Sequence, residues 1–138
     1  MAIKLTEGQI ENDFRNMLCD SKLSKAITGD IYFETMRPRD SKLEDIVIIF
    51  TEGDAGEIQT GKVTLNIFVP DIAPFVDGVR VKDKSRLDYL SSLAQEWIEG
   101  INPSMTRYKI LNRATITTSS DDGIQQHFIA VHLWYKYF

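Results

Sequence analysis

The sequence contains a single cysteine, Cys19, so no disulfide can form within its 138 residues. A small secreted domain stapled by disulfides is therefore excluded, and a reducing environment is expected. No stretch approaches the roughly 18 continuous apolar residues of a membrane-spanning helix. Residues 1–7 also lack the apolar core of a signal peptide. We expect a protein that is made in the cytoplasm and stays there, unless it leaves as part of an assembly.

The chain also lacks a large net charge: it has 16 basic and 20 acidic residues, which give a net charge of −4. This balance gives no general attraction to nucleic acid or to an anionic membrane, so we expect neither as a partner. Disorder is excluded by a composition with 43% apolar residues. With no internal repeat and no linker, residues 1–138 are predicted to form one domain.

Two helices are predicted from the spacing of apolar residues. The first begins at a capping box formed by Thr6 and Gln9 and ends near Asp20. The second begins at Ser85 as N-cap and ends at Gly100. Its apolar stripe consists of Leu87, Leu90, Leu93, Ala94, Trp97, Ile98 and Ile101.

Strands are predicted over residues 31–36, 45–50, 57–69, 107–118 and 125–138. Turns are predicted at residues 52–56 and 119–123, where glycine and aspartate cluster. The predicted order is α-β-β-β-α-β-β, which gives an α+β fold with an antiparallel sheet packed against two helices. The loop at residues 70–84 is long and apolar, and we expect it to have a function.

The familiar catalytic patterns are incomplete. Residues 56–62 have the glycine and lysine spacing of a P-loop, but Val63 follows where that motif needs a hydroxyl, and the alternation predicts a strand. His127, expected at the sheet surface, and His132, expected to be partly buried, point to opposite faces of one strand. They cannot share a metal without ligands from another element. Cys19 has no histidine partner in the sequence, so we predict no catalytic residue, cofactor or metal site, and no enzymatic activity.

Charge is unevenly distributed along the chain. Residues 40–57 carry six acids and one lysine, whereas residues 104–138 carry four basic residues and two acids. The acids are expected to form a solvated rim. The two segments could meet head to tail between copies, or neutralise each other within one subunit. The interface candidates are the basic residues Arg37, Arg39, Arg107, Lys109 and Arg113 and the acidic residues Glu44, Asp45, Glu52, Asp54 and Glu57.

The last predicted strand carries aromatic residues on both faces. Such a strand must be covered twice or lie at an interface, although a core position for most of these side chains is the alternative. The apolar loop at residues 72–81 is a second candidate for an exposed surface, and core positions stay the alternative for most of its side chains too. The candidates here are Trp134, Tyr135, Tyr137 and Phe138 from the strand and Phe75 and Val76 from the loop.

Several short motifs carry a resemblance to a known family. They are Thr28–Tyr32, Arg37-Pro38 with Ser41, Glu44–Ile48 and Gly61–Asp71. With the element order, they resemble the tail-terminator family of long-tailed bacteriophages, also described as tail-completion or head–tail joining proteins. The resemblance implies an α+β subunit that forms a ring, commonly a hexamer, which caps the tail tube and meets the head connector. It also implies that the protein assembles in the bacterial cytoplasm and then becomes part of the virion tail. In this family role, the loop after Pro70 and the C-terminal hairpin would face neighbouring subunits or the tail tube.

Two other function classes stay open. A monomeric or dimeric binding module could take up a peptide or ligand at the edge of the final strand. A metal-dependent hydrolase is supported by the acidic cluster alone, with Asp45 and Asp54 as its first candidates. The preferred prediction is a non-enzymatic structural protein of a phage or prophage.

Overall fold

Helix α1 (Glu7–Cys19) begins at the capping box expected from the sequence. The Gln9 amide donates to Thr6 Oγ1 at 3.2 Å, and the Thr6 amide donates to Gln9 Oε1 at 2.8 Å. Helix α3 (Lys84–Glu99) ends at Gly100 as predicted, but its N-cap is Asp83, two residues earlier than Ser85. The Asp83 carboxylate accepts from the Arg86 amide, and a carboxylate is a strong cap.

Two short helices were not predicted. They are α2 (Lys22–Ala26), capped by Ser21, and α4 (Pro103–Thr106), which has proline in its first turn. Both are too short for apolar periodicity to reveal them, and their capping residues are the available sequence signal. None of the helices in the described part of the chain is long and apolar enough to cross a bilayer.

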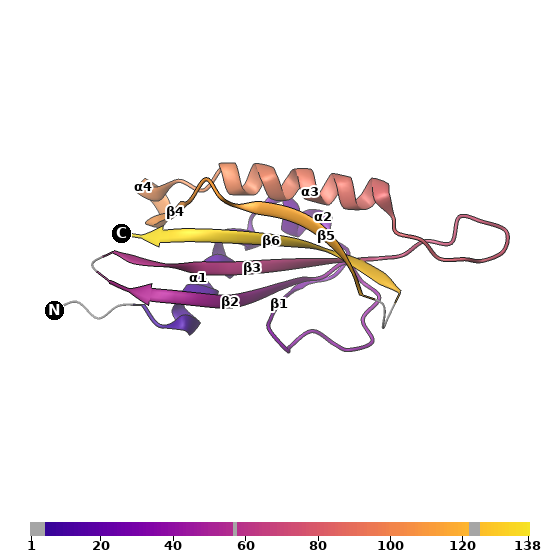
Figure 1. The fold of residues 1–138 in the computed structure, drawn as a ribbon, viewed down its shortest axis with the longest axis horizontal. Coiled ribbons are helices and arrows are strands. Elements are labelled where there is room, and N and C mark those ends of the chain that lie inside the picture. Colours follow the sequence, from indigo (N-terminus) through magenta and orange to yellow (C-terminus); the bar gives the residue numbers. More distant parts are fainter. Residues whose placement is uncertain (1–4, 57, 122–124) are drawn as a thin grey trace.

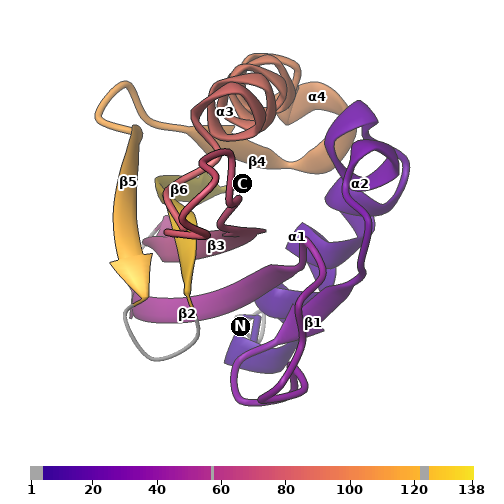
Figure 2. The ribbon, with the colours of Figure 1, turned by 90° about the vertical axis from the view of Figure 1, so that its right-hand side faces the viewer.

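The computed structural model describes residues 5–56, 58–121 and 125–138. Its strands form one six-stranded sheet, and the helices pack against one face of that sheet (Figures 1 and 2). The order along the sheet is β1-β2-β3-β6-β4, with β5 also paired to β6. The α+β class is confirmed, with the strands β1 (Ile31–Phe33), β2 (Ile46–Ala55), β3 (Gln59–Pro70), β4 (Tyr108–Ile110), β5 (Thr115–Asp121) and β6 (Gln126–Tyr137).

The element order differs from the prediction in several places. β1 pairs with β2 in parallel, so the sheet is not purely antiparallel. β1 ends at Phe33, shortly before Thr35 adopts a positive φ of 68°. β2 continues through residues 52–55, which were predicted as a turn, because these residues pair with Gln59–Lys62. The predicted strand 107–118 is interrupted after Ile110, and its two parts pair with successive stretches of β6. Of the predicted turn 119–123, β5 takes residues up to Asp121, and the rest lies outside the described residues.

The core lies between the helices and the sheet. Alternate residues of β3 and β6 point into it, as their sequence pattern predicted. Helix α1 contributes Ile10, Phe14 and Leu18, and helix α3 contributes Leu87 and Leu90. The sheet residues buried against these helices are Ile46, Ile48, Val63, Leu65, Ile67, Val69, Ile129, Val131, Leu133 and Tyr135.

Candidate functional site

A buried ion pair joins Arg37 to Asp45. Arg37 Nε lies 2.8 Å from Asp45 Oδ2, and the Asp45 side chain is fully buried. The same carboxylate also accepts from Ser41 Oγ at 2.6 Å and from the Asp30 amide at 2.9 Å. The Arg37 guanidinium lies 4.0 Å from the centre of the Phe68 ring, which adds a cation–π contact. Every charge in this cluster therefore has partners within its own subunit.

A second ion pair joins Glu44 to Arg86. Arg86 Nε lies 2.6 Å from Glu44 Oε2, and Arg86 Nη2 lies 2.8 Å from Glu44 Oε1, so the contact is bidentate. This hydrogen bond, with the charge of Glu44, raises the pKa of Arg86 above its usual value, although burial acts in the opposite direction. The guanidinium also donates to the Ala26 carbonyl oxygen, which ties α2 to α3.

These two pairs correct the prediction of a solvated acidic rim. Glu44 and Asp45 are buried, and both are neutralised by arginines of the same chain. Arg37 is used in the same way, so these three candidates do not offer free charge to a neighbouring subunit. Sequence reasoning missed Arg86 because its partner lies 42 positions away. Its position in the first turn of α3 gave no such signal.

The other charged candidates lie on the surface. Arg39, Arg107, Lys109 and Arg113 are exposed, as are Glu52 and Asp54. Glu57 lies outside the described residues. The exposed acids and Arg113 line one groove of about 390 Å³, beside Trp134. Arg113 and Lys62 lie 4.3 and 4.8 Å from the centre of the Trp134 ring. Charge of both signs is thus brought together within one subunit.

The aromatic candidates of β6 separate into core and surface. Tyr135 is completely buried and packs against Phe14 and Tyr108, so it is a core residue and not an interface residue. Tyr137 is half-buried against Tyr108, and Trp134 is half-buried in the groove beside Arg113. Phe138 is 51% exposed.

The position of β6 corrects the predicted binding edge. β6 pairs with β3 on one side, and with β4 and then β5 on the other. A strand that is paired on both sides has no open edge at which a peptide could add. The central residues of β6 that face the helices are buried, whereas His132 and Trp134 on the other face are half-buried.

The loop predicted at residues 70–84 forms a projecting hairpin, which we call the arm (residues 71–83). It extends beyond the start of α3 at the right-hand end of Figure 1. Ile72 and Val81 pair across its base, and Gly78 takes a positive φ of 77° in its turn. A hydrogen bond between His127 Nδ1 and Asp71 Oδ1, at 2.7 Å, joins the base to β6. Phe75 is 58% exposed and Val76 109% exposed, so both candidates lie open to solvent.

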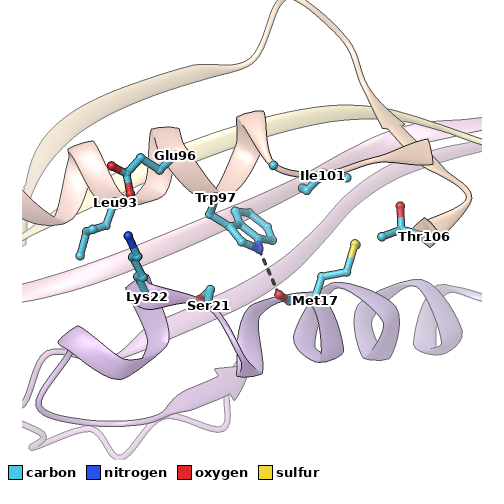
Figure 3. Close-up of a pocket in the computed structure, with 9 residues that line it drawn as sticks. Met17, Ser21, Lys22, Leu93, Glu96, Trp97, Ile101 and Thr106 are labelled. Atoms are coloured by element: carbon cyan, nitrogen blue, oxygen red, sulfur yellow. Dashed lines mark hydrogen bonds between the residues drawn. The ribbon is translucent and has the colours of Figure 1, made fainter. Parts of the chain in front are cut away.

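A second groove, of about 380 Å³, opens between α3 and the α1–α2 junction (Figure 3). Trp97 Nε1 donates to the Met17 carbonyl oxygen at 3.1 Å, which fixes the indole in the groove wall. The groove was not predicted, although the apolar stripe of α3 continues past its buried residues and gave a signal. We call it the helix groove, and it is lined by Met17, Ser21, Lys22, Leu93, Glu96, Trp97, Gly100, Ile101 and Thr106.

Groups capable of chemistry are few and dispersed. His132 lies half-buried on the sheet face away from the helices, and its Nδ1 is 3.1 Å from Thr64 Oγ1. Burial lowers the pKa of His132, and the charge of Lys62 lowers it further. Within residues 5–56, 58–121 and 125–138 no group of three or more His, Cys, Asp or Glu side chains could hold a metal ion. Cys19 is exposed at the end of α1.

The sequence matches no family model and no curated protein. A solved structure whose name states no function is similar over 98% of this chain and 97% of its own. Its identity to this chain is 16% and the TM-score is 0.49, so the likeness carries no argument about function.

Proposed function

We propose that the protein is a non-enzymatic structural subunit that assembles with copies of itself into a ring at the end of a phage or prophage tail. Its partners are then the tail tube and the head connector, and it passes from the host cytoplasm into the virion. The proposal builds on the motif resemblance, and the observation that carries it is the arm. Phe75 and Val76 project into solvent from an ordered hairpin, where they have no role in the core.

The exposed charges support the same proposal. Arg39, Arg107 and Lys109 remain on the surface, as do Glu52 and Asp54. Charges of both signs on one small subunit favour contacts between unlike surfaces of two copies. We expect such contacts to weaken as salt screens them, because the Debye length falls from about 10 Å at 0.1 M to about 3 Å at 1 M.

The test is the mass of the protein in solution, measured by light scattering after size-exclusion chromatography at several protein and salt concentrations. We expect a closed species of several subunits that dissociates as the salt concentration rises, with a ring visible by electron microscopy. The double variant Phe75→Ser/Val76→Ser should stay monomeric. Met36→Ser is the matched control, because Met36 is 67% exposed and belongs to the segment between β1 and β2, outside the arm. A strict monomer at every concentration would contradict the proposal.

One observation favours a second candidate, a module that binds peptides by strand addition. Within the described residues β5 pairs with β6 alone, and most of its side chains are exposed. A peptide would therefore add at β5 rather than at β6. Thr117→Pro, which removes a backbone donor, should abolish saturable peptide binding by a monomer if this candidate is right. Saturable peptide binding that survives in Thr117→Pro, or no peptide binding by the unmodified protein, would count against it.

A further inference from the structure

We infer that the arm of one subunit docks in the helix groove of a second copy, a contact that rests on the proposed function and specifies how the copies join. The chain carries an apolar protrusion and an apolar hollow. The two surfaces lie at different places on the subunit, and both are lined by apolar side chains. Phe75 and Val76 form the protrusion. Leu93 and Trp97, one turn apart on α3, and Ile101, just beyond its C-cap, line the hollow.

The arm cannot fill the groove of its own subunit. It leaves the sheet at the start of α3, whereas the groove lies at the end of α3, beside α4 and the α1–α2 junction (Figures 1 and 3). The two surfaces therefore lie at opposite ends of the longest helix. A contact between them must join different copies in a head-to-tail manner, which closes into a ring when the rotation between subunits permits.

The size of the groove fits this occupant. At about 380 Å³ it is at the small end of the range of ligand pockets, which is about 300–1,000 Å³. It offers space for a few side chains and not for a whole helix. The arm presents its apolar residues on a hairpin held at its base by the Ile72–Val81 pairing. A preformed hairpin loses little conformational entropy when it docks.

Charge is complementary as well. Lys22 and Glu96 lie on opposite walls of the groove, one from α2 and one from α3 (Figure 3). Neither has an ion-pair partner among the described residues. The arm carries Asp77 near its tip and Lys82 on its returning strand, and both are exposed. A docked arm can therefore place one charge of opposite sign beside each wall.

The test uses one variant for each side of the contact. Phe75→Ser/Val76→Ser removes the protrusion and leaves the groove intact. Gly100→Phe fills the groove with a side chain of its own. Gly100 has an ordinary φ of −83°, and an added Cβ would meet the nearest atom at 3.5 Å, so the backbone at this position accepts a side chain. Gly8→Phe is the matched control, since a Cβ at Gly8 meets nothing within 4 Å.

We expect each variant alone to be monomeric, because every apolar side chain lost from the contact weakens self-association about tenfold or more. An equimolar mixture of the two variants should form a heterodimer and nothing larger. One intact arm and one intact groove make a single contact, which no further copy can extend. Light scattering with one variant carrying a mass tag measures this directly.

Three results overturn the inference, and they separate it from the proposed function. If the wild-type protein assembles and Gly100→Phe assembles equally well, the groove is not the docking site, but self-assembly stands. If both variants are monomeric and their mixture remains so, the arm and groove belong to different contacts. If the wild-type protein is monomeric at all concentrations, the inference and the proposed function fail together.

Discussion

Arg37 and Asp45 form an ion pair inside the subunit, with 2.8 Å between Nε and Oδ2 and no exposed surface on the aspartate side chain. The pair holds the segment between β1 and β2, because Ser41 and the Asp30 amide bind the same carboxylate. It also reaches β6, where Arg37 Nη2 donates to Gln126 Oε1 at 3.1 Å.

Removing one partner of this pair should destabilise the protein strongly. For Arg37→Met we expect the free energy of unfolding to fall by about 3–5 kcal/mol, because a buried carboxylate is left without its cation. Urea unfolding measures the change. Arg39→Met is the control, since Arg39 is exposed and should change the free energy of unfolding by less than about 0.5 kcal/mol. A loss equal to the control would show that Asp45 does not depend on Arg37.

Gly29 lies against the same carboxylate. A Cβ at this position would come within 1.9 Å of Asp45 Oδ1 and within 2.7 Å of the Glu44 carbonyl oxygen. Gly29→Ala should therefore lower the free energy of unfolding by about 1–3 kcal/mol through overpacking. Gly8→Ala should act in the opposite direction, by roughly 0.5–1 kcal/mol, because Gly8 lies in α1 with open space around it. Equal effects in thermal unfolding would contradict this.

Two buried tyrosines should respond oppositely to loss of the hydroxyl group. Tyr108 Oη donates to Asp13 Oδ2 at 2.6 Å, whereas Tyr135 Oη has no hydrogen-bond partner among the described residues. Tyr108→Phe should cost about 1.5–3 kcal/mol, since its acceptor is charged. Tyr135→Phe should be neutral or should stabilise the fold by about 1 kcal/mol, because an unsatisfied polar atom is removed. Chemical denaturation of both variants makes the comparison.

The hydroxyl group of Tyr135 also makes the free energy of unfolding depend on pH in the alkaline range. Burial raises the pKa of Tyr135 from its ordinary value of 10 to about 12. As the pH rises, the Tyr135 phenol therefore loses its proton in the unfolded chain before it does so in the folded protein. The contribution of this pKa difference to the free energy of unfolding is fully present below pH 10. We expect it to be lost as the pH rises from 10 to 12, by up to about 2–3 kcal/mol. In Tyr135→Phe the free energy of unfolding should fall less steeply over that interval.

The pKa of His132 should depend on the charge of Lys62. Burial lowers the pKa of His132, and the charge of Lys62 adds to this effect. The folded state then favours the neutral ring, so its contribution to stability is present above the ordinary value of 6.5 and is lost as the pH falls below it. Lys62→Met should raise the pKa of His132 in an NMR titration. Lys109→Met should leave it unchanged, because Lys109 lies on β4, away from this ring.

The sequence allowed α1 and α3 to be predicted well, because a capping box and a long apolar stripe are local signals. It also predicted the inward faces of β3 and β6, since strict alternation fixes which residues share a face. The break between β4 and β5 could not be predicted in the same way. Residues 107–118 alternate throughout, and the interruption follows from how the two halves meet β6.

The partners of the buried charged residues could not be predicted from the local sequence. Glu44 and Asp45 follow a polar loop, which is typical of solvated acids, yet their arginine partners come from positions 86 and 37. Such pairs depend on the tertiary arrangement and leave no periodic trace in the chain. Phe75 and Val76 are exposed, which is one of the two placements that the sequence left open, because apolar composition alone does not decide whether a loop is buried.

The pairing of β3 with β6 also determines how the chain reaches its native state. Partners in this ladder are between 56 and 78 residues apart, so the centre of the sheet forms after a long loop has closed. Sheets built from such distant pairings fold on the millisecond-to-second timescale. Until β6 arrives, β3 presents an unpaired apolar edge that can join the same edge of another chain. Refolding yield should therefore fall as protein concentration rises, because aggregation competes with the closure of this loop.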